Sequence, residues 1–429
     1  MRSAVIETLT SARLRQSYSR IRHRSGLTVC VLPKRSAVTC GVIGVNFGAN
    51  DRTFCLPGGE VMTLPAGTAH FLEHKMFAAR DGEEDAIARF ARIGANADAY
   101  TTPDLTAYQF STTDAAYPAL EILLDFLFHP YFTEENVEKE RAIIAQEIRM
   151  YDDTPVQAGY YGLMEAMYHT HPIRDNVGGT EASIRQITPE LLYTCHKAFY
   201  RPDNMTLCVA GRVEADGVLS VLDRCLPERG EHPAPERIFV PEPVYPAVQS
   251  VQYQADAAIP LLYLGFKDPI LPADSAARMR RAAAADILND ILFCRSSPIY
   301  ADLYTRGLIN GRFGAEYEYA DTYGYALISA ESAQCDAVDA QIRQYLADRR
   351  ALHDITDAQF SRCRRVMYAS AVTAFESAED MAAECLDCEM EGTDMFTPVD
   401  VMMQITKEDL FYVLDTLYLP KQLCRCVVT

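Results

Sequence analysis

The stretch Gly67-Thr-Ala-His70-Phe-Leu-Glu73-His74-Lys-Met-Phe77 carries the most specific pattern in this sequence. We expect residues 67–79 to form a helix. Residues four apart share one face of a helix, so His70 and His74 would present their imidazoles to one ion, with Glu73 beside them. A catalytic zinc needs neutral nitrogen ligands, an open position for water and a carboxylate that takes the water's proton. The His-x-x-Glu-His pattern therefore predicts two zinc ligands and a general base.

A third ligand is required, because two histidines alone do not hold a catalytic zinc. The predicted helix 133–152 contains Glu140 and Glu147, which are two turns apart on one face. Glu147 is flanked by Ile144 and Ile148, at the edge of an apolar face where an unpaired carboxylate is costly. The alternative interpretation of these carboxylates is a solvated acidic face of the helix.

The combination of the two segments resembles the pitrilysin family, which includes insulin-degrading enzyme and the mitochondrial and bacterial processing peptidases. The resemblance implies a zinc-dependent endopeptidase that encloses and hydrolyses extended peptides. It assigns the zinc (Zn²⁺) to His70, His74 and Glu147. Glu73 would activate the water, and Glu140 would assist from behind the ligands. The likeness is strongest to the bacterial YmfH-like branch, through His-Phe-Leu-Glu-His-Lys and Gln-Glu-Ile-x-Met-Tyr-Asp-Asp.

A second segment, Gly94-Ala-Asn-Ala-Asp-Ala-Tyr-Thr101, resembles the family's edge strand, which pairs with an extended substrate. The predicted substrate-binding residues are Asp98, Ala99, Tyr100 and Thr101. The family usually carries Asn at the place of Asp98, and a carboxylate cannot donate as an amide does. The contact of Asp98 with the substrate backbone is therefore expected to differ.

The order of predicted elements indicates an α+β protein of two similar halves. Strands at 27–32, 39–47 and 106–112 alternate with helices in the first half, and a strand at 261–267 opens the second. A proline-rich stretch at 229–246 predicts a stiff linker between domains 1–228 and 247–429. The resemblance implies that each half is an antiparallel sheet flanked by helices, and that the halves form a half-clamshell.

The predicted second domain lacks the zinc motif and departs from the family in one further respect. Self-sufficient members carry there an Arg and a Tyr seven residues apart, which bind the substrate and stabilise the tetrahedral intermediate. This chain has Leu303 and Asn310 at those places, whereas Arg312 and Tyr319 have the spacing in another register. We therefore expect a heterodimer in which a homologous, metal-less partner supplies these groups. The alternative is a non-catalytic scaffold or peptide-binding subunit, although such relatives usually lose motif residues.

Composition excludes several other classes. A net charge of −19 argues against a nucleic-acid binder, which needs a basic face. No apolar run approaches the length of a membrane span. Thirteen scattered cysteines fit a reducing, cytoplasmic setting, and Cys385 and Cys388 are interpreted as incidental thiols. The Arg- and Ser-rich first two dozen residues are interpreted as the first piece of the folded domain, because they lead directly into a strand.

Overall fold

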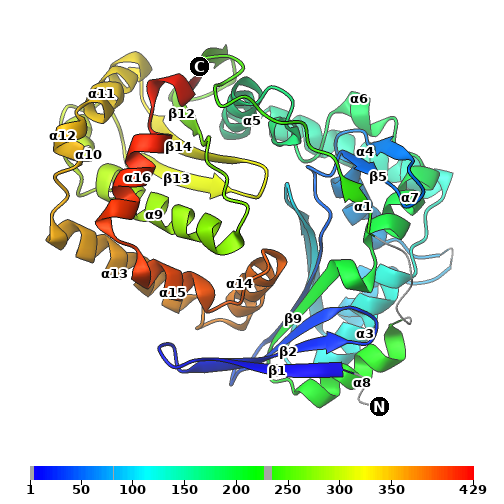
Figure 1. Cartoon of the computed structure of the whole chain (residues 1–429). Helices are drawn as coiled ribbons and strands as arrows, with labels where there is room; N and C mark the ends of the chain where they lie inside the picture. Colours follow the sequence, from blue (N-terminus) through cyan, green and yellow to red (C-terminus); the bar gives the residue numbers. More distant parts are fainter. Residues whose placement is uncertain (1–3, 81, 227–233) are drawn as a thin grey trace. The chain divides into compact units, whose positions relative to one another are not determined.

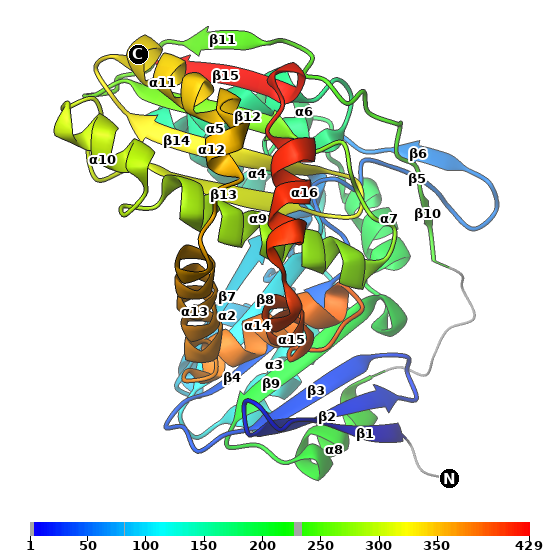
Figure 2. The same cartoon turned by 60° about the vertical axis from the view of Figure 1, so that its left-hand side comes forward.

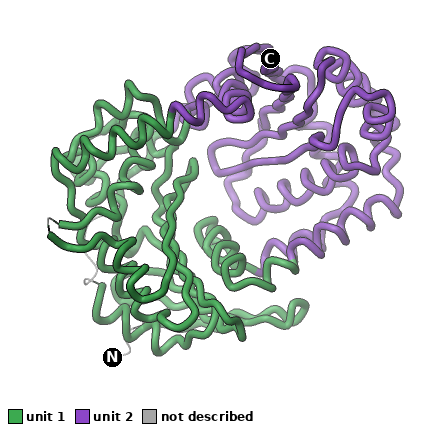
Figure 3. The backbone as a smooth tube through the Cα atoms, turned by 180° about the vertical axis from the view of Figure 1, so that it is seen from behind, with its two compact units in different colours: residues 1–148, 176–238, 372–395 green, residues 149–175, 239–371, 396–429 purple. Residues whose placement is uncertain are grey.

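The computed structural model describes residues 4–80, 82–226 and 234–429, and it divides into two compact units. Unit 1 contains the residues up to 148, 176–238 and 372–395, and unit 2 contains 149–175, 239–371 and 396–429 (Figure 3). Each unit combines a sheet with helices, which confirms the α+β prediction. The predicted domains follow sequence order, whereas the compact units exchange two segments across the linker. Residues 229–233 of that linker lie outside the described residues.

Unit 1 is built on a seven-stranded sheet of order β1-β2-β3-β9-β4-β8-β7. All neighbours in it are antiparallel except β3 and β9. The Arg- and Ser-rich start of the chain forms its first hairpin, β1–β2, as part of the fold (Figure 1). The strands are β1 (Ala4–Ser11), β2 (Gln16–His23), β3 (Thr28–Pro33), β4 (Thr39–Val45), β7 (Ala95–Thr101), β8 (Thr106–Thr112) and β9 (Met205–Gly211).

Helices cover both faces of this sheet. Most pack their apolar residues with every second side chain of the strands into one core. They are α1 (Thr68–Met76), α2 (Ala86–Arg92), α3 (Ala116–Phe128), α4 (Glu134–Asp152), α6 (Glu181–Ile184), α7 (Pro189–Phe199) and α8 (Ala215–Cys225). Helix α14 (Ala378–Met390) packs on β3, β4 and β9 (Figure 2). It lies on the opposite face, where Gly44 leaves room for Leu386.

Unit 2 contains a five-stranded sheet of order β11-β15-β12-β14-β13. The strands are β11 (Ser250–Tyr253), β12 (Leu261–Lys267), β13 (Gly314–Tyr319), β14 (Gly324–Glu331) and β15 (Leu423–Val428). One face packs against α5 (Pro155–Met167). The main core of unit 2 lies with α9 (Ser275–Phe293), α10 (Pro298–Thr305), α11 (Cys335–Ala347), α12 (Arg349–Leu352), α13 (Asp357–Thr373), α15 (Thr397–Gln404) and α16 (Lys407–Leu417).

The two sheets share one topology. The strands β3, β4, β7, β8 and β9 of unit 1 correspond, in chain order, to β11, β12, β13, β14 and β15 of unit 2. In each set of five, the fifth strand lies between the first and the second, and the fourth lies between the second and the third. The first and fifth strands of each set are parallel. The prediction of an antiparallel sheet in each half is therefore wrong for this one pair of strands in each unit. The similarity of the halves is therefore a property of strand order, which repeats although no repeat is visible in the residues.

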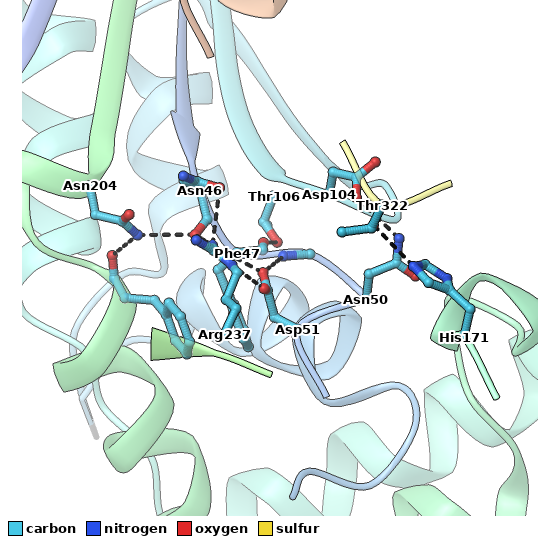
Figure 4. A network of polar contacts seen from close by, with 12 residues as sticks. Asn46, Phe47, Asn50, Asp51, Asp104, Thr106, His171, Asn204, Arg237 and Thr322 are labelled. Carbon is cyan, nitrogen blue, oxygen red and sulfur yellow. Dashed lines mark hydrogen bonds and ion pairs between the residues drawn. The ribbon is translucent and has the colours of Figure 1, made fainter. Parts of the chain in front are cut away.

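The described part of the proline-rich stretch is held by specific contacts. In unit 1, β10 (Glu236–Arg237) pairs with β5 (Thr53–Cys55), which also pairs with β6 (Val61–Thr63). Arg237 forms an ion pair with Asp51 and donates to Asn46 Oδ1 at 3.0 Å (Figure 4). In unit 2, Glu242 forms an ion pair of 2.6 Å with the buried Lys267. The stretch is therefore bonded to each unit rather than free.

Among the described residues, no helix combines the length and apolarity needed to cross a membrane.

Candidate metal centre

The two histidines and Glu73 lie on α1, as the sequence predicts. The helix begins after Gly67, which adopts a left-handed conformation with φ of 85°. A β-carbon on Gly67 would lie 2.4 Å from the carbonyl oxygen of Gly178, and one on Gly179 would lie 2.4 Å from that of Ala66. The hydroxyl of Ser183 also donates to the Ala66 carbonyl at 2.8 Å. Glycine is thus required on both sides of this close backbone approach, which fixes the start of α1.

Helix α4 brings Glu147 opposite the two imidazoles. Glu147 Oε1 lies 3.7 Å from His70 Nε2, and Glu147 Oε2 lies 3.5 Å from His74 Nε2. One ligand atom from each of the three residues lies within 4.8 Å of the other two. The rings of His70 and His74 meet edge to face, with centroids 4.6 Å apart. Three donors from two helices therefore face one point.

The packing of α4 explains why Glu147 faces inward. Ile144 and Ile148 are buried in the core of unit 1, which fixes the rotation of the helix about its axis. The side chain of Glu147 is 21 % exposed and that of Glu140 18 %. A solvated acidic face does not describe these two carboxylates, because each lies within 4 Å of a histidine nitrogen.

Glu140 contacts His74 on the side of the ring away from Glu147. Nδ1 of His74 lies 3.1 Å from Glu140 Oε1, so that the other ring nitrogen is the one near Glu147. A carboxylate that accepts the remaining ring N–H fixes the orientation of a ligand histidine and raises its basicity. Burial alone would lower the pKa of His74, but the hydrogen bond to Glu140 and the nearby carboxylates raise it.

His70 is kept neutral by its surroundings. Burial, with a smaller effect of His74, lowers the pKa of His70 to about 4. Its Nδ1 is buried and has no hydrogen-bond partner among the described residues. A neutral imidazole offers a lone pair, which is the form that binds a metal ion. The donor set of two imidazoles and one carboxylate suits zinc and leaves a fourth position open.

Glu73 lies next to the cluster on the same helix. Its carboxylate accepts a hydrogen bond of 2.8 Å from the hydroxyl of Thr101. Burial raises the pKa of Glu73, and the hydrogen bond from Thr101 opposes that rise. A carboxylate with a raised pKa is suited to take up and release a proton near neutral pH.

The predicted substrate-binding residues lie on β7, which is the last strand of the sheet and pairs only with β8 among the described strands. Ala99 packs on the core of unit 1, Tyr100 is half-buried, and Asp98 is exposed. The carboxylate of Asp98 accepts the N–H of Ala99 at 2.9 Å. Burial, with the charge of Asp387, raises the pKa of Tyr100 to about 12.

Sequence reasoning missed two contributors to the centre. Lys75 is buried, and its Nζ lies 3.4 Å from Glu140 Oε2. The Gly178–Gly179 turn lies against the start of α1. Nothing in the residue types of either segment indicates these contacts.

The Arg and Tyr alternatives lie in unit 2. Leu303 is fully buried in the core, and Asn310 donates to Glu331 at 2.5 Å. Arg312 lies 2.8 Å from Glu331, just before β13, and Tyr319 ends that strand. Arg312 is thus paired with Glu331, and a joint role of Arg312 and Tyr319 stays a prediction.

Comparisons with known proteins agree with this geometry. Residues 63–181 match the family described as "Insulinase (Peptidase family M16)", and residues 186–367 match the "Peptidase M16 inactive domain". A Bacillus subtilis protein named uncharacterized zinc protease YmfH is 32 % identical over 99 % of both chains. The putative zinc protease AlbF of Bacillus subtilis is 24 % identical over 92 % of this chain and 91 % of the relative.

Two solved structures are similar in fold. A putative M16-like peptidase from Alicyclobacillus acidocaldarius has a TM-score of 0.90 and 32 % identity, covering 100 % of this chain and 99 % of that one. A protease from Helicobacter pylori has a TM-score of 0.82 at 19 % identity, covering 99 % of this chain and 100 % of that one. The second likeness concerns the fold alone.

The close approach at Gly67 yields a stability prediction. Gly67→Ala places a methyl group against the Gly178 carbonyl in addition to its left-handed strain, whereas Gly94→Ala at φ 71° meets no atom within 4 Å. We expect Gly94→Ala to cost about 1 kcal/mol and Gly67→Ala about 2 kcal/mol more. Urea unfolding of both variants measures the difference. Equal losses of unfolding free energy in the two variants would show that the turn at 178–179 shifts to accept the methyl group without destabilising the protein.

Proposed function

The chain belongs to the insulinase family, peptidase family M16, and from this membership we propose that it is a zinc-dependent endopeptidase acting on extended peptides. The observation that carries the proposal is the convergence of His70, His74 and Glu147 from α1 and α4. A zinc ion held by these residues would supply a Lewis acid for peptide hydrolysis. Thirteen free cysteines support a reducing, cytoplasmic setting as part of the same proposal.

The remaining residues of the centre have proton-handling and orienting roles in this proposal. Glu73 takes a proton from the attacking water and gives it to the amine nitrogen of the departing peptide. Thr101 positions the Glu73 carboxylate through its hydroxyl. Glu140 fixes the ring of His74 by accepting its N–H. The contacts of Thr101 with Glu73 and of Glu140 with His74 support these roles.

The substrate in this proposal is an extended peptide that adds to β7. The strand is at the edge of its sheet and ends at Thr101, next to Glu73. Backbone hydrogen bonds along an edge strand hold a peptide independently of its sequence. The net charge of −19 favours basic segments through long-range attraction.

We also propose that a homologous, metal-less partner completes the catalytic centre. The places of the family's Arg and Tyr hold Leu303 and Asn310, which are committed to the core and to Glu331. Stabilisation of the tetrahedral intermediate is a large part of peptidase catalysis. A chain without those groups would therefore retain the hydrolytic residues and lack this contribution.

The first test concerns Glu73. Glu73→Gln keeps the shape of the side chain and removes the base, so peptide hydrolysis should fall by roughly 10²- to 10⁴-fold while bound zinc is retained. Glu135→Gln, an exposed position on α4, is the matched control and should keep both. Zinc content and cleavage of an unfolded peptide by the chain with its native partner are the measurements. Unchanged hydrolysis in Glu73→Gln would refute the assignment.

The second test concerns the partner. The purified chain alone should cleave at least about 100-fold more slowly than the complex isolated from the host, because one missing stabilising donor costs that much. Steady-state rates of both preparations at equal zinc content measure this. Full activity of the isolated chain would disprove the need for a partner and leave the zinc assignments intact.

The third test uses the pH dependence. Thr101→Val removes the hydrogen bond that lowers the pKa of Glu73, so this pKa rises further. The general base must be ionised, so the acid limb of the activity profile should move to higher pH. Thr101→Ser retains the hydroxyl and should keep the wild-type profile. An acid limb at one pH in all three proteins would exclude this role of Thr101.

A further inference from the structure

A second group of metal-binding side chains lies in unit 1, away from the histidine cluster. The sulfur atoms of Cys30, Cys208 and Cys385 all lie within 4.8 Å of one another. Each of the three side chains is fully buried. They come from three elements, β3, β9 and α14, which are distant in the sequence.

The fold explains why these thiols meet. Cys30 and Cys208 are directly paired in the parallel register of β3 and β9. Their neighbours Val29, Val31 and Leu207 belong to the core on one face, so the two cysteines project from the other. Helix α14 packs on that face and contributes Cys385. The convergence therefore follows from strand register and helix packing together.

A carboxylate stands beside the thiols. Glu389 lies one turn after Cys385 on α14, and its side chain is 4 % exposed. It accepts hydrogen bonds from the Tyr18 hydroxyl at 2.9 Å and from Arg20 Nη2 at 2.6 Å. Cys30 interacts with this carboxylate as well as with the other two thiols. This anchored carboxylate interacts with Cys30 and Cys385, but its oxygens are not within 4.8 Å of all three sulfurs.

Cysteine binds zinc as the thiolate, so an ion bound between these three sulfurs would displace the thiol protons to solvent.

We propose that Cys30, Cys208 and Cys385 form a structural zinc site that fastens α14 to the sheet. Glu389, one turn along α14, would turn toward the sulfurs to supply the oxygen donor. Zinc–sulfur bonds of about 2.3 Å place the sulfurs of a tetrahedral site roughly 3.8 Å apart. The thiols therefore need to close by about 1 Å at most. A disulfide would use two of these sulfurs and leave the third, whereas one ion uses all three.

The proposed zinc site also affects the surroundings of the edge strand β7, to which the substrate is proposed to add. A cavity of about 190 Å³ lies between α14 and the strands next to that edge. Its lining includes Asp98 of β7 and Glu379 of α14. An ion that fastens α14 would thus hold one wall of this cavity in place beside the edge strand.

The test uses Co²⁺ as the probe, because thiolate ligands give Co²⁺ a strong near-ultraviolet charge-transfer absorption. The histidine centre contains no sulfur and cannot give this band. The full chain is produced with Co²⁺ in place of Zn²⁺, so that the ion is available while α14 packs. We expect the band, two equivalents of cobalt per chain and slowed backbone hydrogen exchange along α14.

Variants assign the band to its site. Cys385→Ser should lose the charge-transfer band and one equivalent of cobalt. Cys388 is a buried cysteine on the same helix but outside the cluster, so Cys388→Ser should keep the band and both equivalents of cobalt. Cys30→Ser, on β3, is the second variant, and circular dichroism of the metal-free proteins checks folding. His70→Ala should lose the other equivalent and keep the band, which separates this proposal from the peptidase assignment. Absence of the band in the wild-type chain, or its persistence in Cys385→Ser, would overturn the proposal.

Discussion

The centre of this protein depends on the cost of removing charged groups from water. Helices α1 and α4 place two imidazoles against two carboxylates, and all four side chains are largely covered. Such groups are unfavourable in a protein interior unless each finds a partner or an ion. Glu140 contacts His74 and Lys75, whereas the contacts of Glu147 within the described part of the chain are long ones, of 3.5 and 3.7 Å, to the imidazoles. A cation between the three donors, as proposed, would complete this arrangement.

Contacts with the rest of unit 1 fix the rotation and the position of these two helices. Ile144 and Ile148 fix the rotation of α4, and the contact of Gly67 with Gly178 fixes where α1 begins. The edge strand β7 ends where Thr101 reaches Glu73. In the proposed function, this single hydrogen bond sets peptide pairing next to proton transfer.

Local periodicity predicted the main elements well. The expected strands 106–112 and 261–267 agree with β8 and β12 to the residue, and the expected helix 133–152 differs from α4 by one. The parallel pairing of β3 with β9 was not predictable, because register between distant strands is set by tertiary packing. The same reason explains why 372–395 belongs to unit 1, although it follows most of unit 2 in the chain.

The sequence by itself determined the residue types and their spacing: His70, Glu73 and His74 on one helix, and Glu140 and Glu147 on another. Helical geometry makes spacing of this kind sufficient to choose a face. Only the tertiary structure decided that the two faces meet, that Glu140 faces His74, and that Cys385 joins Cys30 and Cys208. Those contacts join residues far apart in the chain, and they arise from packing of apolar surfaces. Because the hydrophobic effect is non-directional, the residues of one apolar surface do not indicate which other surface it will pack against.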